Sequence, residues 1–415
     1  MAALSPALKQ STGVVAVRGE GCYLFDGEGR RFLDFTSGIG VVSTGHCHPL
    51  VVEAARAQAG ELIHGQYTTV RHPQLDRLSE ELGSVLPAGL DSVFFASAGT
   101  ESVEAAVRLA RHATGRTNIV VFQGSFHGRT MGSLAMTTSK AAYRAGLQPL
   151  MGGVFVSPFP YAIQLGMRQD EAVEFALAQF DYLLSTQTSP DETAAVVVEP
   201  VLGEGGYVPA PAAFLNGLAK RSREIGALFV ADEVQTGFAR TGRFWAVDHC
   251  GLIPDVLITA KGLASGFPLS AFAASTDLMS RAWPGSQGGT YGGNAVACAA
   301  AVATLDVIRD EGLEDNAAER GVQLLSLLDD VRQLHPDVVA EVRGLGLMAA
   351  IEFRGHDGAE LAHRVIDQAE ARGLLLLTCG PGGAVVRWIP PLIVSAQQIS
   401  EAVEVFSESL DAAVS

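Results

Sequence analysis

Two residues of this sequence could together perform chemistry between amines and carbonyl groups. Lys261 follows the apolar run from Val256 to Ala260 and precedes Gly262. A lysine partly removed from water loses pKa, and its neutral amine forms imines with aldehydes and afterwards acts as a base. Asp232 ends another apolar run, where a fixed carboxylate could hold a protonated ring nitrogen. This pair indicates pyridoxal phosphate (PLP), the commonest aldehyde partner of such a lysine.

The phosphate of that cofactor would need backbone N–H donors at the start of a helix. Ala98, Gly99 and Thr100 lie where an apolar run ends and a helical pattern begins. Acidic residues in a first turn compete with a phosphate for the same helix dipole, so we expect Glu101 and Glu104 to point away from it. The segment is therefore a candidate phosphate site.

The elements that must position these residues follow a regular alternation. From about residue 90 to residue 275, short apolar runs alternate with helical patterns, which predicts βαβ units and an α/β fold with a mainly parallel sheet. The predicted strands are Ser92 to Ser97, Asn118 to Phe122, Ala194 to Val198, Ala227 to Ala231 and Val256 to Ala260. Crossover helices are predicted at residues 101–112 and 211–225, where apolar residues recur at helical spacing.

Several candidate site residues follow the carboxyl ends of these predicted strands, where open α/β sheets bind their ligands. They are Ser97, Gly99 and Thr100 after the first strand, Phe126, His127 and Arg129 after the second, Glu199 after the third, Asp232 and Gln235 after the fourth, and Lys261 after the fifth. Each has an ordinary explanation alone: Asp232 could cap a helix, and Lys261 could be a solvated charge. Their common placement favours one functional site.

The two ends of the chain show residue patterns that differ from the central alternation. The first fifty residues are rich in glycine and short alternating runs, which predicts a small sheet. After Asn294 the pattern is helical to about Leu334, and β-like runs then flank a further helix. We expect a large domain with a mainly parallel mixed sheet between helices and a smaller α+β domain from both termini. The predicted boundaries are 1–48, 49–293 and 294–415.

Composition argues against several kinds of partner. A formal net charge of −16, without a basic stripe, argues against nucleic acid. Met1 to Gln10 lacks the pattern of an export leader, and no run is apolar enough for a membrane span, so a cytoplasmic chain is expected. The five cysteines are scattered, and His46 and His48 have metal-like spacing without further ligands. We therefore expect reduced thiols and no metal.

Over nearly its whole length, the sequence resembles the class III aminotransferases of PLP fold type I. The motifs that carry the resemblance occur in the family's order and at its spacing. They are LDFTSGIGV at 33–41, GHCHP at 45–49, SFHGRT at 125–130, EPVLGEGG at 199–206, DEVQTG at 232–237, AKGLASGFP at 260–268 and GGTYGGN at 288–294. The resemblance implies fold type I and transfer of an amino group by a ping-pong mechanism.

Carried over position by position, the resemblance implies a role for each cofactor-binding residue. The set comprises Lys261 for the imine, Asp232 for the ring nitrogen, Gln235 for the phenolic oxygen, Phe126 and Val234 for the two ring faces, and Gly99 and Thr100 for the phosphate. Thr290 is expected to reach that phosphate from a second subunit. A site shared in this way implies an obligate homodimer.

Among class III enzymes, the sequence is most similar to 4-aminobutyrate aminotransferases. The likeness implies that Arg129 binds the substrate's distal carboxylate and that Arg387 binds the α-carboxylate of glutamate or 2-oxoglutarate. Glu204 is expected to pair with Arg387 when the amine donor lacks an α-carboxylate, because an unpaired buried arginine is costly. Ile39 and Glu199 complete the expected substrate set.

The predicted reaction converts 4-aminobutyrate to succinate semialdehyde and then 2-oxoglutarate to glutamate, with Lys261 moving the proton. Acetylornithine, ornithine and other ω-amine aminotransferases remain alternatives. Residues 63–70 lack the Ser and Asn usual there in acetylornithine enzymes, which favours 4-aminobutyrate. A noncatalytic PLP-binding regulator could have lost Glu204, Arg129 and Arg387, yet all three are present. Arg387 with Glu204 also argues against an aminomutase, which needs no external acceptor.

Overall fold

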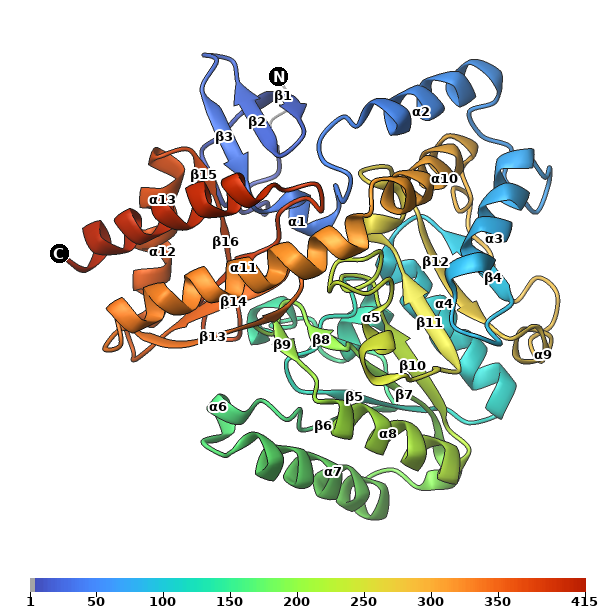
Figure 1. Cartoon of the computed structure of the whole chain (residues 1–415). Coiled ribbons are helices and arrows are strands. Elements are labelled where there is room, and N and C mark those ends of the chain that lie inside the picture. Colours follow the sequence, from blue (N-terminus) through green and yellow to red (C-terminus); the bar gives the residue numbers. More distant parts are fainter. Residues whose placement is uncertain (1–3) are drawn as a thin grey trace.

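A seven-stranded sheet forms the centre of the larger part of the chain. The computed structural model, which describes residues 4–415, orders its strands β4-β12-β11-β10-β7-β5-β6 (Figure 1). The strands are β4 (Ser92–Ala96), β5 (Asn118–Phe122), β6 (Val154–Ser157), β7 (Thr193–Val198), β10 (Leu228–Asp232), β11 (Val256–Thr259) and β12 (Ser270–Ala274). All five predicted strands are therefore present. Residues 1–3 belong to the segment that was predicted to lack an export leader, and they lie outside the described residues.

The sheet is mixed but mainly parallel, as predicted. Strands β6, β5, β7, β10 and β11 run parallel to one another. β12 is antiparallel to both β11 and β4, so it is the reversed strand of the sheet. Asp232 pairs with Ile258, and Ala231 pairs with Val198. This register brings the carboxyl ends of β7, β10 and β11 to one edge.

Helices cover both faces of this sheet, which explains why its strands are apolar throughout. Ile119 and Val121 of β5 pack in one cluster with residues of α4 (Gly99–Thr114). The alternate residues Val120 and Phe122 pack in the other cluster, with residues of α7 (Gln169–Thr186) and α8 (Ala212–Ile225). Side chains alternate across a strand, so each face needs its own apolar set.

Two smaller sheets contain strands from the ends of the chain. One has the order β1-β2-β3-β15 and the other β13-β14-β17-β16. Their strands are β1 (Ala16–Glu20), β2 (Tyr23–Asp26), β3 (Arg31–Asp34), β13 (Val339–Leu345), β14 (Met348–Phe353), β15 (Leu374–Leu375), β16 (Leu377–Cys379) and β17 (Val385–Trp388). β15 lies parallel to β3, so the last hundred residues complete an N-terminal sheet. The α+β part is therefore built from both termini, while the boundaries at 48 and 293 stay predictions.

The helical pattern after Asn294 forms two helices. α10 (Ala295–Asp310) is almost entirely buried, and α11 (Leu313–Leu334) follows it. Gly312 has a φ of 62°, a left-handed conformation that suits glycine and separates the helices. Among the described residues, no helix is long and apolar enough to cross a bilayer.

The remaining elements connect these layers. They are α1 (Ser37–Gly40), α2 (Pro49–Glu61), α3 (Pro73–Val85), α5 (Met131–Met136), α6 (Ala162–Leu165), β8 (Val201–Leu202), β9 (Val208–Pro209), α9 (Thr276–Met279), α12 (Gly358–Ala371) and α13 (Ala396–Val414). The red C-terminal helix α13 lies close to the blue N-terminal strands in Figure 1, in agreement with its contacts to β15.

Candidate active site

A cavity of about 370 Å³ lies beyond the carboxyl ends of the central strands. Its wall contains most of the residues that the sequence singled out. They are Gly99, Thr100, Phe126, Arg129, Glu199, Glu204, Asp232, Val234, Gln235 and Lys261. The parallel strands therefore bring together side chains that are far apart in the sequence, as expected for an α/β sheet.

Lys261 is half-buried and begins a short 3-10 helix directly after β11. Its φ of 39° is left-handed, a conformation that costs free energy for any residue with a side chain. Removal from water lowers the pKa of its amine to about 8, against the opposing charge of Glu204. Near neutral pH a useful fraction of this amine is therefore uncharged and nucleophilic.

We expect the cofactor-free protein to capture PLP at a rate that rises with pH and levels off near pH 8. The lowered pKa of Lys261 means that its neutral amine dominates above about pH 8. Below the plateau the rate should fall about tenfold per pH unit, since the neutral fraction falls in that way. Rapid-mixing absorbance measurements at a series of pH values test this. A rate that keeps rising to about pH 10, the range of an ordinary lysine, contradicts it.

Asp232 is buried at the end of β10 and is held by two neighbours. The Val234 amide donates to Oδ1 at 3.1 Å, and His127 Nδ1 lies 2.6 Å from Oδ2. Burial lowers the pKa of His127, but the hydrogen bond and charge of Asp232 outweigh burial and raise it. A protonated His127 supports the carboxylate charge that could pair with a cationic ring nitrogen. The sequence placed His127 at the same edge but did not predict this contact.

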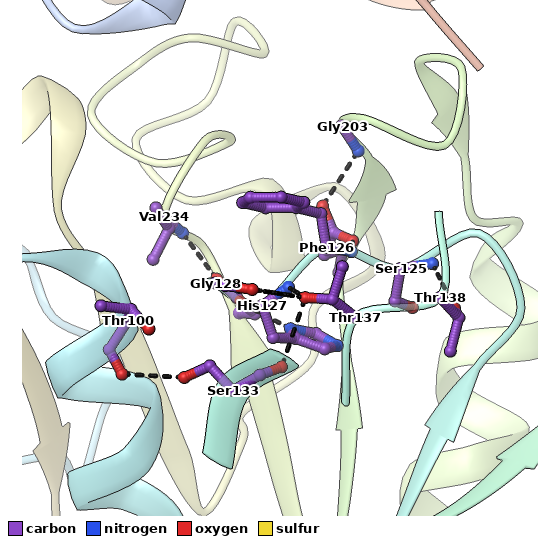
Figure 2. A network of polar contacts seen from close by, with 12 residues as sticks. Thr100, Ser125, Phe126, His127, Gly128, Ser133, Thr137, Thr138, Gly203 and Val234 are labelled. Carbon is purple, nitrogen blue, oxygen red and sulfur yellow. Dashed lines mark hydrogen bonds and ion pairs between the residues drawn. The ribbon is translucent and has the colours of Figure 1, made fainter. Parts of the chain in front are cut away.

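The segment from Gln123 to Thr138 holds Phe126 and His127 in place (Figure 2). The Thr137 hydroxyl accepts hydrogen bonds from the His127 and Gly128 amides at 3.0 and 3.2 Å. The Ser125 amide donates to the Thr138 hydroxyl at 3.0 Å. These bonds close the loop on itself, so the side chains at 126 and 127 project from a fixed backbone.

The start of α4 corrects one prediction. The carboxylate of Glu101 turns back and accepts the amides of Ser97 and Ala98 at 2.8 and 3.1 Å. Ala98 is therefore not a free phosphate donor, and Glu101 does not point away, because a glutamate at this position caps its own helix. Gly99 and Thr100 occupy the first two helical positions, whose amides have no intrahelical acceptor. These two amides are the donors that can face a phosphate.

The wall of the cavity fits the cofactor that the sequence predicts. A Cβ at Gly99 would lie 3.1 Å from Val234 Cγ1, so glycine keeps the approach to the α4 terminus open. The Oε1 atom of Gln235 is buried and has no hydrogen-bond partner among the described residues. An aromatic face at Phe126, a carboxylate at Asp232 and an unpaired amide oxygen at Gln235 suit a polar aromatic ring.

A buried ion pair joins Glu204 to Arg387 beside the cavity. Burial lowers the pKa of Arg387, but the charge of Glu204 outweighs it and the pKa is raised. Burial likewise raises the pKa of Glu204, yet Arg387 outweighs burial and the pKa is lowered. Glu204 lines the cavity and Arg387 is not part of its wall. In this state the guanidinium is therefore covered by its own carboxylate partner.

Arg129 and Glu199 occupy other parts of the wall. The guanidinium of Arg129 is exposed and lies 4.1 Å from the centre of the Tyr143 ring, a cation–π contact that orients it. Tyr143 in turn packs edge-on against Phe126, with ring centres 5.8 Å apart. Glu199 accepts the amides of Phe126 and Gly203 at 2.7 and 2.9 Å. Burial raises the pKa of Glu199 to about 7.

Besides Arg387, the predicted site residues Ile39 and Thr290 lie outside the cavity wall of a single chain. Both are exposed. Ile39 has a φ of 68°, which is unusual for a β-branched residue. The carbonyl of Thr290 lies 2.8 Å from His64 Nε2. Within one chain the fold therefore does not bring either residue to the others.

The histidines with metal-like spacing have other partners. His46 Nε2 lies 2.8 Å from Asp34 Oδ2, and His48 Nε2 lies 2.9 Å from Glu311 Oε1. In the described part of the chain, no three His, Cys, Asp or Glu residues form a group that could hold a metal ion.

Comparison with known proteins agrees with this geometry. The family model for aminotransferase class III matches residues 5–410. The chain is 37% identical to a probable 4-aminobutyrate aminotransferase of Bacillus subtilis, over 99% of this chain and 95% of the relative. It is 38% identical to an acetylornithine aminotransferase of Archaeoglobus fulgidus, over 94% of each chain. A crystal structure of a transaminase from the marine bacterium Virgibacillus superposes with a TM-score of 0.91 at 28% identity, covering 97% of this chain and 93% of the other.

The fold and the family match together define a transaminase. The chain belongs to the class III aminotransferases. Enzymes of this class depend on PLP, so this protein is a PLP-dependent aminotransferase of fold type I. Identity to relatives with different donors is nearly equal, so the donor must be inferred from the site.

Proposed function

We propose that the protein transfers the amino group of 4-aminobutyrate to 2-oxoglutarate, yielding succinate semialdehyde and glutamate. The observation that carries this proposal is the buried pair of Glu204 and Arg387 beside a cavity that also holds Arg129. A donor without an α-carboxylate leaves that pair intact, whereas 2-oxoglutarate offers a carboxylate that can replace Glu204. One pocket can thus serve both substrates.

The cofactor residues have distinct tasks in this proposal. When bound, PLP supplies an electron sink that makes the amine-bearing carbon of the substrate acidic. Lys261 would hold the aldehyde carbon of PLP, and its Nζ would accept the proton that leaves the substrate carbon. Asp232 would bind the ring nitrogen and Gln235 the phenolic oxygen. Phe126 and Val234 would contact the two ring faces, and the amides of Gly99 and Thr100 would bind the phosphate.

The substrate residues orient the chain of the donor. Arg129 binds the distal carboxylate, and a bidentate guanidinium contact of this kind is worth roughly 1.5–3 kcal/mol. Arg387 binds the α-carboxylate of 2-oxoglutarate after Glu204 moves aside. Glu199, which lies in the cavity wall, limits the space beside the reacting carbon. The exposed position of Arg129 supports its role as the first contact for an incoming carboxylate.

We further propose that the enzyme is a cytoplasmic homodimer in which Thr290 reaches the phosphate of the partner's site. The exposure of Thr290 and of the neighbouring Tyr291, 67% exposed, supports a surface that a second copy covers. Sedimentation velocity measures the assembly directly. A purified, cofactor-loaded protein that sediments as a single chain contradicts the shared site.

The proposed donor is tested with separate aliquots of the PLP-loaded enzyme, without 2-oxoglutarate. We expect 4-aminobutyrate to remove the visible absorbance of the bound cofactor and N-acetylornithine to leave it unchanged. The reverse result assigns the chain to acetylornithine, the donor in the name of one relative. Bleaching by 5-aminovalerate or β-alanine alone assigns it to another ω-amine. No absorbance after PLP addition contradicts the cofactor site itself.

A further inference from the structure

The segment that carries Glu204 is held at several points of its backbone. Residues Gly203 to Gly206, called the gate loop below, form the turn between β8 and β9. The Gly203 amide donates to Glu199 Oε2 at 2.9 Å, and the Glu204 carbonyl accepts the Gly380 amide at 2.9 Å. The Gly206 carbonyl accepts both Nε and Nη2 of Arg343, at 3.0 and 2.6 Å. The backbone is therefore fixed on both sides of Glu204.

The two arginines that contact the gate loop come from one row of the small antiparallel sheet. Arg343 of β13 pairs with Ala350 of β14, and Ala350 pairs with Arg387 of β17. Residues directly opposite each other in a sheet project from the same face, so Arg343 and Arg387 point to the same side. The small side chain of Ala350 lies between them. Figure 1 shows the β8–β9 hairpin next to β13, which it contacts.

The two guanidinium groups therefore bind different parts of the gate loop, one its side chain and the other its backbone. Arg387 binds the side chain of Glu204, the group that has to move when 2-oxoglutarate binds. Arg343 binds the backbone carbonyl of Gly206, two residues further along the same loop. With the backbone anchored, Glu204 can leave Arg387 by rotation of its side chain alone, and it can return to the same position.

The head group of Arg343 is itself held rigidly. Its Nη1 donates to Glu341 Oε2 and Glu352 Oε2 at 2.7 and 2.6 Å, and its Nη2 donates to the Tyr161 hydroxyl at 2.7 Å. The residue is only 9% exposed. A Cβ at position 206 would lie 3.2 Å from Nη2, so a glycine is needed for this close approach. All of these contacts exploit the planar fork of arginine, which a lysine lacks.

We propose that Arg343 is a positioning residue that sets the balance between the two half-reactions by anchoring the gate loop. The inference rests on the proposed role of Glu204 and extends it to a residue outside the cavity. With 4-aminobutyrate bound, Glu204 must stay on Arg387, and a loosened loop weakens that pairing. With 2-oxoglutarate bound, Glu204 has already moved aside, so the anchor matters little.

The test compares Arg343→Lys with the wild type in separate half-reactions of the PLP-loaded enzyme. The concentration of 4-aminobutyrate needed for half-maximal rate should rise about tenfold, as expected for lost charged hydrogen bonds. The value for 2-oxoglutarate should change by less than about twofold. Arg354→Lys is the matched control, because Arg354 also holds a backbone carbonyl of the same sheet, that of Val339, at 3.0 Å. It should leave both values unchanged.

Two further measurements separate anchoring from general damage. In a Glu204→Ala background, Arg343→Lys should have no additional effect on 4-aminobutyrate, because the anchor then has nothing to position. Hydrogen exchange of residues 200–209 should be faster in Arg343→Lys than in the wild type or in Arg354→Lys. If the lysine variant does not fold, Tyr161→Phe removes one contact of the head group and should give a smaller change in the same direction.

The outcomes distinguish this inference from the proposed donor. A wild type that fails to react with 4-aminobutyrate contradicts the donor, and the exchange measurement still decides the anchor. Unchanged exchange in residues 200–209, or equal losses in both half-reactions, overturns the role of Arg343. Additive effects of Arg343→Lys and Glu204→Ala also overturn it, since independent sites add.

Discussion

Lys261→Ala is expected to lower turnover by at least about 10⁴-fold, because both covalent capture of the cofactor and proton transfer depend on this one amine. No other lysine lines the cavity among the described residues. The steady-state rate of glutamate formation from 4-aminobutyrate and 2-oxoglutarate measures the loss. Lys220→Ala is the matched control, since that side chain is 72% exposed on α8 and should be dispensable.

The Lys261→Ala variant also distinguishes covalent capture of PLP from its noncovalent binding. The amides of Gly99 and Thr100 and the carboxylate of Asp232 remain, so Lys261→Ala should still retain PLP without a covalent bond. Borohydride treatment followed by mass analysis should label the peptide that contains Lys261 in the wild type and no peptide in the variant. Labelling of another lysine together with retained turnover contradicts the assignment of Lys261.

Arg387→Ala is expected to damage the two half-reactions very unequally. The rate constant for 2-oxoglutarate at low concentration should fall about 100-fold, because its α-carboxylate loses a charge-assisted partner. The constant for 4-aminobutyrate, which has no α-carboxylate, should change by less than about tenfold. Absorbance changes after rapid mixing with each substrate measure both constants.

The variant leaves Glu204 without its partner, and this effect needs its own control. Arg387 holds the pKa of Glu204 below its usual range against the effect of burial, so removing Arg387 should let burial raise that pKa. The double variant Glu204→Gln/Arg387→Ala removes the unpaired charge and should recover lost thermal stability without recovering 2-oxoglutarate activity. Equal losses in both half-reactions contradict the exchange of carboxylates at Arg387.

The sequence predicted those parts of the fold that depend on local pattern. The strands were found because each is a short apolar run, and their polar ends pointed to Asp232 and Lys261. The antiparallel strand β12 and the break at Gly312 were not specified, because pairing order and helix breaks depend on contacts made elsewhere in the chain. Periodicity alone does not say which strand lies beside which.

For the candidate site, the sequence predicted which residues line the cavity but not which side chains contact one another. The residues followed from the resemblance, whereas side-chain contacts depend on distances in the folded chain. His127 lies beside Asp232 because the loop that follows β5 reaches past β7 to the end of β10. Glu101 caps its own helix because exposed amides at a helix start are satisfied by the nearest acceptor. The His127 contact follows no spacing rule, whereas Glu101 stands at the third helical position, the spacing of a capping box.

The pairing of β3 with β15 delays completion of the N-terminal sheet during synthesis of the chain. Leu33 pairs with Leu374, so β3 has no edge partner until synthesis has passed the central sheet and reached Leu374. During that interval β3 presents an open edge, which is the kind of surface that recruits chaperones or aggregates. A nascent chain that stalls before residue 374 therefore cannot close its N-terminal sheet, even with the whole cavity wall up to Lys261 already synthesised. Closure of the N-terminal sheet thus depends on β15 reaching β3.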